Sequence, residues 1–318
     1  MKKTLSNIAL FSLIPLLFLI AIFIIPVNRK YAYNFVIRGG CEGRSSWIYQ
    51  RMFDSDSAID VAFIGSSHTM SAVNDELTEK HFNDSTHRNY KFVNLGYCGF
   101  GRDFHYLITK DLLEHKKVRC IVLELNEAES QFGNGSFPNV AATSDLFGAP
   151  IAFNRSYFPD LYKGLLLRIQ YFRELVTKEN LQRDLPIPES RFGFNGTDRN
   201  ADLQQLEDAK RKNYGPQKLT IPFVEDGLNS YAMAYVHRIV ALAEKYNVQI
   251  CFLYLPEYGF PLHAEDLKNT YGRYGKIIIP DMQVLDTPTN WCDKGHLNTK
   301  AANSYSNTLA NELIGLIR

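Results

Sequence analysis

Two short motifs, far apart in the chain, contain residue types that can carry out nucleophilic catalysis. Residues 65–69 (GSSHT) follow an apolar run, and Ser67 stands where a tight turn can lift its hydroxyl into a ligand crevice. Asp293 and His296 are three residues apart, so the carboxylate can hold the imidazole in one tautomer. The imidazole could then accept the proton of Ser67. A helix cap at Ser67 and a surface turn at Asp293 are the ordinary alternatives.

Three further groups could stabilise negative charge on a reacting carbonyl oxygen. They are the N–H of Ser67, the N–H of Gly96 after a second apolar run, and the side chain of Asn126 after a third. Asn126 is equally typical of a residue that starts a turn. His68 lies beside the nucleophile, where a side chain usually points elsewhere, so we assign the role of base to His296.

Five short apolar runs separate the amphipathic stretches of the chain. The runs are residues 59–64, 90–95, 120–125, 248–255 and 276–279, and helical periodicity covers residues 104–116, 231–246 and 304–317. β-Branched runs of this kind, buried on both faces, are typical of parallel strands. The alternation predicts a doubly wound, three-layer α/β fold, in which ligands bind beyond the carboxyl ends of the strands.

The chain divides into an N-terminal segment of residues 1–29, a connector of residues 30–57 and an α/β domain of residues 58–318. Residues 128–229, rich in Phe, Pro, Asn and Arg, interrupt the alternation. Long loops without structure are rare in compact domains, so this insertion should contain helices, at about 161–177 and 201–212. It forms either a lid over the site or a peripheral addition.

The N-terminal segment has the character of a membrane anchor. Residues 8–27 carry no charge and are long enough to cross about 30 Å of hydrocarbon as a helix. Lys2 and Lys3 precede them and favour a cytoplasmic N-terminus with an extracytoplasmic body. A cleaved signal peptide is the alternative, but no small-residue cleavage motif follows Val27.

Composition argues against several other classes of protein. The net charge of +1 supplies no basic surface for nucleic acid. The 5 cysteines form no CxxC pair, so neither a zinc site nor a redox dithiol is indicated, and their odd number leaves at least one free thiol. The glycine spacing in residues 96–101 is not the dinucleotide fingerprint. We therefore expect no metal and no cofactor.

Together these motifs resemble the SGNH (GDSL-like) hydrolase superfamily. Its members have a flavodoxin-like α/β/α fold with a parallel sheet. The nucleophile follows the first strand, a glycine the second and an asparagine the third, and a DxxH pair precedes the last helix. The matching positions here are Ser67, Gly96, Asn126, Asp293 and His296. The resemblance implies a catalytic triad of Ser67, His296 and Asp293, with an oxyanion hole of Ser67, Gly96 and Asn126.

The closer likeness is to the membrane-anchored branch of this superfamily that acts on cell-envelope polymers. This branch includes the teichoic acid D-alanylation protein and the SGNH-like acetyltransferases of exopolysaccharide assembly. Their first motif often reads Gly-Ser-Ser, as residues 65–67 do, and their last often reads DxxHLN, as residues 293–298 do. Two departures are Ser66, which replaces the aspartate of the hydrolase motif, and the lack of the usual Gly-x-Asn-Asp around Asn126.

The leading hypothesis is a membrane-anchored, extracytoplasmic serine acyltransferase or esterase. It would act on a surface polysaccharide or related envelope polymer through an acyl-serine intermediate, which passes to water or to a sugar hydroxyl. The resemblance implies a membrane partner that exports the acyl group. The alternative is a non-catalytic SGNH-fold scaffold of an envelope assembly complex, because a fold alone does not imply activity.

Overall fold

The computed structural model describes residues 11–13, 15, 17, 20–35, 41, 43–125, 132–151, 154–178, 189–213 and 231–317. Within these residues, five strands form one sheet: β1 (Val61–Ile64), β2 (Phe92–Asn94), β3 (Cys120–Leu125), β4 (Gln249–Tyr254) and β5 (Lys276–Ile278). All neighbouring strands pair in parallel, in the order β2-β1-β3-β4-β5. The protein is thus a mixed α/β protein with a parallel sheet, and each predicted apolar run contains one strand.

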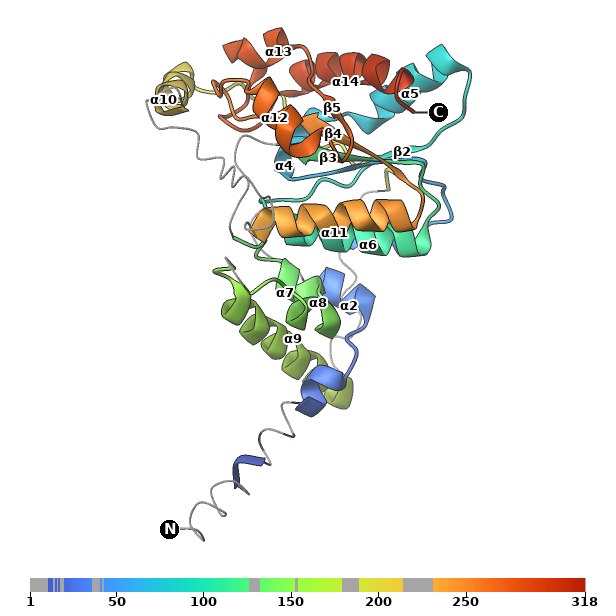
Figure 1. The fold of residues 1–318 in the computed structure, drawn as a ribbon, viewed down its shortest axis with the longest axis vertical. Helices are drawn as coiled ribbons and strands as arrows, with labels where there is room; N and C mark the ends of the chain where they lie inside the picture. The colour runs from blue at the N-terminus through green and yellow to red at the C-terminus, as the bar shows by residue number, and fades with distance from the viewer. Residues whose placement is uncertain are drawn as a thin grey trace.

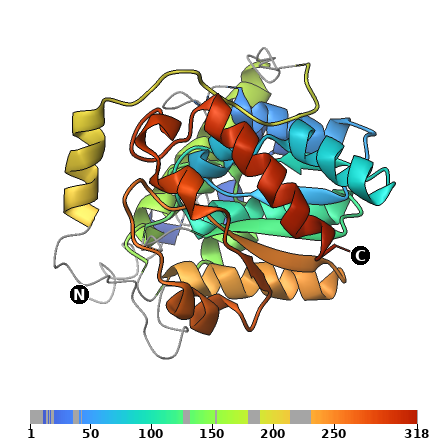
Figure 2. The ribbon, with the colours of Figure 1, turned by 90° about the horizontal axis from the view of Figure 1, so that it is seen from above.

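Helices cover both faces of this sheet (Figures 1 and 2). One face carries α4 (Ser67–Ala72), α5 (Asp75–Thr86) and α14 (Thr299–Ile314), and the other carries α6 (Arg102–His115) and α11 (Tyr231–Lys245). Alternate residues of a strand therefore enter different cores. Ile121 and Leu123 pack in the core shared with α6 and α11, whereas Val122 packs in the core shared with α14. This arrangement confirms the predicted three-layer packing.

The short elements near the C-terminus are α12 (Ala264–Tyr271), α13 (Met282–Asp286) and the 3₁₀ turn η2 (Pro288–Asn290). Leu267 and Tyr271 of α12 pack in the core shared with α6 and α11, whereas Leu285 of α13 packs in the core shared with α14. Helix α14 begins before the predicted residue 304, because the Asn298 side chain accepts a hydrogen bond from the N–H of Ala301 and caps the helix. The first turn of α14 carries no large apolar side chain, so apolar periodicity could not reveal it.

The predicted connector is an integral part of the domain core. It contains α2 (Arg29–Asn34), α3 (Arg44–Tyr49) and the π-helical turn η1 (Gln50–Asp54). Tyr33, Trp47, Ile48 and Met52 are buried in the core that also receives α6 and α11. Their spacing places large apolar side chains on one side of each short helix, which explains why residues 44–54 pack as helices and not as a tether.

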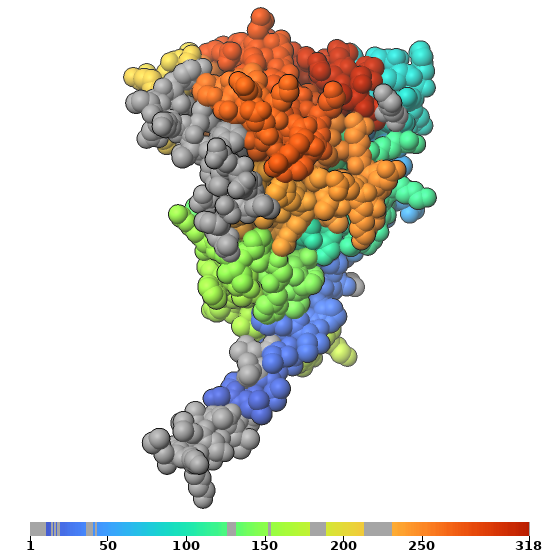
Figure 3. Space-filling model, in the orientation of Figure 1, coloured from blue at the N-terminus to red at the C-terminus, as the bar shows by residue number. Residues whose placement is uncertain are grey.

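The described part of the insertion forms helices in two places. The first group is α7 (Phe137–Val140), α8 (Thr143–Phe147) and α9 (Tyr157–Thr177), and the second is α10 (Leu203–Asn213). Helices α7–α9 and α2 form a lobe beneath the α6–α11 layer, at the end of the molecule from which the N-terminal segment extends (Figures 1 and 3). The two predicted helices correspond to α9 and α10.

The predicted membrane anchor lies only partly within the described residues. Residues 1–10, 14, 16, 18 and 19 fall outside them. Within the described ranges, no helix combines the length and the apolar character needed to cross a membrane.

A disulfide joins the connector to the loop that follows β2. Cys41 precedes α3 and Cys98 follows Gly96, and the two are 57 residues apart in sequence. Cys120, Cys251 and Cys292 are free and buried. Near this bridge, the Arg44 guanidinium donates to the carbonyls of Asn94 and Gly96, each at 2.8 Å. The bridge and Arg44 together hold the connector against the loop after β2.

Removing this disulfide should destabilise the folded protein. We expect the double variant Cys41→Ser/Cys98→Ser to lose roughly 2–4 kcal/mol of unfolding free energy, because the unfolded chain regains the freedom of a long loop. Urea denaturation with and without reductant measures this loss. Reductant should lower the midpoint of the unsubstituted protein and leave that of the double variant unchanged. Equal midpoints for both proteins without reductant would contradict the prediction.

Candidate active site

Ser67 lies at the point where strand β1 passes into helix α4. Ser66 is the N-cap of this helix, and its hydroxyl accepts a hydrogen bond from the N–H of His68 at 3.1 Å. Gly65 has no room for a side chain, because a Cβ there would overlap Thr69 Oγ1 and the Glu124 carboxylate. β1 has β2 on one side and β3 on the other. Ser67 therefore lies at the topological switch point of the sheet, where α/β proteins commonly bind ligands.

The structure brings Ser67, His296 and Asp293 into one hydrogen-bonded chain. His296 Nε2 lies 2.8 Å from Ser67 Oγ. His296 Nδ1 lies 2.8 Å and 2.9 Å from the two oxygens of Asp293. All three residues are partly exposed. This is the arrangement in which an imidazole accepts a serine proton while a carboxylate fixes its tautomer.

The turn that carries Asp293 and His296 is itself closed by the carboxylate. Asp293 Oδ1 accepts the N–H groups of Gly295 at 2.9 Å and His296 at 3.0 Å. Burial raises the pKa of Asp293, but the bond from the imidazole and those from the two N–H groups outweigh burial and lower the pKa to about 2. Arg199 lies 3.9 Å from the second carboxylate oxygen. Asp293 is therefore ionised throughout the neutral pH range.

We expect Asp293→Asn to lower kcat on an acyl ester by roughly 10⁴-fold, because the amide cannot stabilise the imidazolium form of His296. The titration of Asp293 itself should add no pH dependence to this loss between pH 5 and pH 9. The pKa of Asp293 in the folded protein is below its ordinary value. Protonation of Asp293 should therefore weaken its bond to His296 only as the pH falls below about 4 toward 2. Kinetics across this range test the prediction, with exposed Asp286→Asn as the matched control. Retention of kcat within threefold would exclude a catalytic role for the carboxylate.

Glu124, near the end of β3, organises the turn that carries Ser67. Its carboxylate accepts the N–H and the hydroxyl of Ser66, each at 2.7 Å. It also accepts the N–H of Thr69 at 3.1 Å and the Thr69 hydroxyl at 2.5 Å. Burial opposes ionisation, but His68, His105 and these donors lower the pKa of Glu124 below its ordinary value. A buried carboxylate with these four donors fixes the residues on both sides of Ser67.

The groups predicted to stabilise an oxyanion differ in whether their donors already have a hydrogen-bond partner. Ser67 is the first residue of α4, and its N–H donates to no acceptor within the described residues. The N–H of Gly96 donates to Asn94 Oδ1 at 2.9 Å. A Cβ at Gly96 would lie 2.7 Å from the Met70 nitrogen. The tight approach at Gly96 is thus made by the first turn of α4. Asn126 lies outside the described residues.

His68 is buried beside the triad and does not bond to Ser67. Its Nδ1 lies 3.3 Å from the carbonyl oxygen of Leu255. Its ring centroid is 5.4 Å from that of His296, at 86°. Burial lowers the pKa of His68, so the neutral imidazole is favoured. The His68 side chain thus helps to wall the site, and His296 Nε2 lies within hydrogen-bond distance of the Ser67 hydroxyl.

One stretch of the insertion borders the site, which sequence reasoning did not locate. The N–H of Asn195 donates to the carbonyl of Met70 at 2.9 Å, and the N–H of Ala201 donates to that of Trp291 at 2.7 Å. Between these anchors, the Thr197 carbonyl accepts the N–H of Thr299 at the start of α14. Residues 195–201 thus connect helix α4, which begins at Ser67, with the turn that carries His296. Arg199 belongs to this stretch.

The described residues contain no group of three or more His, Cys, Asp or Glu side chains that could hold a metal ion. No protein-family model and no curated protein sequence matches the chain. A solved structure of the lipase Lip_vut3 from a goat rumen metagenome is similar over 82% of this chain and 99% of that one, with 10% sequence identity and a TM-score of 0.35. At that TM-score the likeness carries no argument, so the functional conclusion depends on the geometry of the site.

Proposed function

We propose that the protein is a serine acyltransferase or esterase of the SGNH type. The observation that carries the proposal is the continuous chain of hydrogen bonds from Ser67 Oγ through His296 to Asp293. Ser67 is partly exposed, so an acyl group can reach its hydroxyl. The order β2-β1-β3-β4-β5 is the flavodoxin-like order, and the DxxH turn directly precedes the last helix, as in that superfamily.

The reaction would proceed in two acyl-transfer steps. Ser67 Oγ bonds to the acyl carbonyl carbon while its proton passes to His296 Nε2, and Asp293 stabilises the imidazolium. The bond to the leaving oxygen then breaks, and that oxygen takes the proton from His296. In the second step an incoming hydroxyl gives its proton to His296 and bonds to the acyl carbon. Ser67 recovers its proton as the ester bond to the enzyme breaks.

The N–H of Ser67 would stabilise the oxyanion formed in both steps, because it donates to no other described group. Gly96 could contribute only if its bond to Asn94 weakens or becomes shared. Asn126 follows β3 directly in sequence and would supply a side-chain donor. All the hydrogen-bond donors proposed for the oxyanion therefore belong to this chain.

The proposed place of action is the extracytoplasmic side of a membrane, on a surface polysaccharide or a related envelope polymer. The apolar N-terminal segment would serve as a single-pass anchor with a cytoplasmic N-terminus. The Cys41–Cys98 disulfide supports an oxidising compartment, where such bonds persist. A membrane protein that exports acyl groups would supply the donor, as the resemblance to envelope acetyltransferases implies.

The decisive experiment is covalent labelling of the full-length protein, purified in detergent, with a fluorophosphonate probe. We expect intact-mass analysis to show one adduct, and peptide mapping to place it on Ser67. Ser67→Ala should abolish the adduct, and Ser304→Ala, which removes an exposed serine on α14, should leave it unchanged. A folded protein without an adduct, or an adduct that persists in Ser67→Ala, would refute the proposal. Unlabelled protein, supplied with p-nitrophenyl acetate as the acyl donor, can then be tested with water and with polysaccharide acceptors to separate esterase from transferase.

A further inference from the structure

An exposed apolar stripe runs the length of helix α9. The side chains that form it recur every three or four residues and belong to Phe158, Tyr162, Leu166, Ile169, Phe172 and Val176. Phe158 is 75% exposed, Leu166 46% and Val176 65%. Isolated exposed apolar residues are ordinary, but a contiguous row along one helix marks an interaction surface. We refer to these six residues as the α9 stripe.

The exposed charged residues of α9 are both basic. Lys163 and Arg173 are exposed, and the other charged side chains of the helix, Asp160, Arg168 and Glu174, are buried. An apolar face bordered by exposed basic residues is typical of a helix that lies in the headgroup region of a bilayer. A symmetric contact between two copies of α9 would bring these basic residues against each other. The charge pattern therefore favours an anionic lipid surface over a second copy of the chain.

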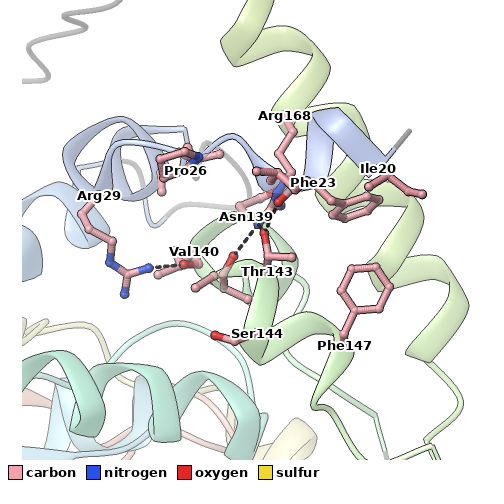
Figure 4. A pocket seen from close by; sticks show the side chains of 15 residues that line it. Ile20, Phe23, Pro26, Arg29, Asn139, Val140, Thr143, Ser144, Phe147 and Arg168 are labelled. Carbon is pink, nitrogen blue, oxygen red and sulfur yellow. Dashed lines mark hydrogen bonds between the residues drawn. The ribbon is translucent and has the colours of Figure 1, made fainter. Parts of the chain in front are cut away.

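The α9 stripe belongs to the same lobe that holds the end of the N-terminal apolar segment. The ring of Phe23 lies 5.0 Å from that of Phe147 in α8, and the Thr143 hydroxyl donates to the Phe23 carbonyl at 2.6 Å. Arg168 of α9 lies 5.4 Å from the Phe23 ring centroid. Residues 20–24 are thus fixed to α8 and α9, as Figures 1 and 4 show. A bilayer that takes up the segment before them must lie beside this lobe.

A cavity of about 950 Å³ lies between the N-terminal segment and helices α7 and α8. Its walls are mainly apolar and include Ile20, Phe23, Ile24, Val140 and Phe147 (Figure 4). None of the triad residues lines it. Lipid acyl chains would fill such a cavity at the membrane surface, whereas in water its apolar walls would remain solvated.

We propose that the α9 stripe, together with exposed Phe147 and Ile151, rests on the bilayer surface and fixes how the catalytic domain faces the membrane. This inference depends on the membrane anchor of the proposed function. It adds a second contact, made by the domain itself, so that the domain is held in one orientation and is not merely tethered. The basic residues Lys163 and Arg173 would contact anionic headgroups.

The contact can be measured by tryptophan quenching in the full-length protein. Single tryptophans are introduced at Leu166 in the α9 stripe, at Leu17 in the N-terminal segment and at exposed Glu312 in α14 as the matched control. The native Trp47 and Trp291 are buried and supply a constant background, measured in the unsubstituted protein. Each variant is reconstituted in vesicles of phosphatidylcholine and phosphatidylglycerol that contain dibrominated lipid. Circular dichroism confirms that each is folded.

We expect strong quenching for Leu166→Trp and Leu17→Trp and none above background for Glu312→Trp. Quenching of Leu17→Trp without quenching of Leu166→Trp would overturn the inference and leave the anchor intact. Absence of quenching in both would refute the anchor as well as the inference. A blue-shifted but unquenched Leu166→Trp would show that protein, for example a second copy, covers the stripe, which also overturns it.

Discussion

Replacement of His296 by alanine is expected to lower kcat/KM for an activated acyl ester by roughly 10³- to 10⁶-fold. The imidazole is the group positioned to accept the Ser67 proton, with Nε2 at 2.8 Å from Oγ. Without it, the hydroxyl loses the base that accepts its proton as the bond to the acyl carbon forms. The loss should appear in kcat, because the imidazole acts on the reacting bonds and contributes little to binding of the ester.

The matched control for this prediction is His81→Ala. His81 is partly exposed on α5, where its ring bonds to Asn311. Its removal should leave kcat/KM unchanged. The double variant Ser67→Ala/His296→Ala should be no slower than either single variant, because the two residues act as one unit. If His296→Ala loses tenfold or less in kcat/KM, another group must act as the base. Neighbouring His68 is then the first residue to test.

The proximity of Ser67, His296 and Asp293 could be predicted from sequence because each of them lies in a local signal. Ser67 follows a short apolar run that ends at Gly65, and Asp293 and His296 share one turn. Parallel strands direct their carboxyl ends to one edge of a sheet, so motifs that follow separate runs must converge there. No knowledge of side-chain packing was needed to bring Ser67 and His296 together. The order of the elements indicates only the edge of the sheet, and the distance of 2.8 Å is a finding of the structure, because α13 and η2 lie between β5 and the turn that carries His296.

Glu124 could not be predicted in the same way. In sequence it is a single acidic residue within the apolar run of residues 120–125, and nothing local distinguishes it from a solvent-facing strand residue. Its function depends on the register of β3 beside β1, in which Ile64 pairs with Leu123. That register places the next residue of β3 beneath the turn after β1. Cys41 and Cys98 were missed for a related reason, since their spacing matches no local motif.

Replacement of Glu124 by glutamine should damage both stability and catalysis while it preserves the size of the side chain. The amide keeps one acceptor oxygen but turns a donor group toward the N–H and hydroxyl donors of Ser66 and Thr69. The loss of charge-assisted bonds in a buried site should lower the unfolding free energy by about 2–4 kcal/mol. Ser67, between Ser66 and Thr69, should then shift relative to His296.

A displacement of about 1 Å can cost roughly 10²-fold in rate, so we expect kcat of Glu124→Gln to fall by about that factor with KM little changed. Measurements below the unfolding transition separate this effect from loss of folded protein. Thr78→Val is a matched control, because Thr78 is also buried but donates its hydroxyl to the Asn74 carbonyl at the start of α5, outside the Glu124 network. Glu124→Asp should recover little, since a shorter side chain keeps the charge but cannot reach all four donors together. Normal kcat in a destabilised Glu124→Gln would mean that Glu124 supports the fold alone and that Ser67 is positioned by other contacts.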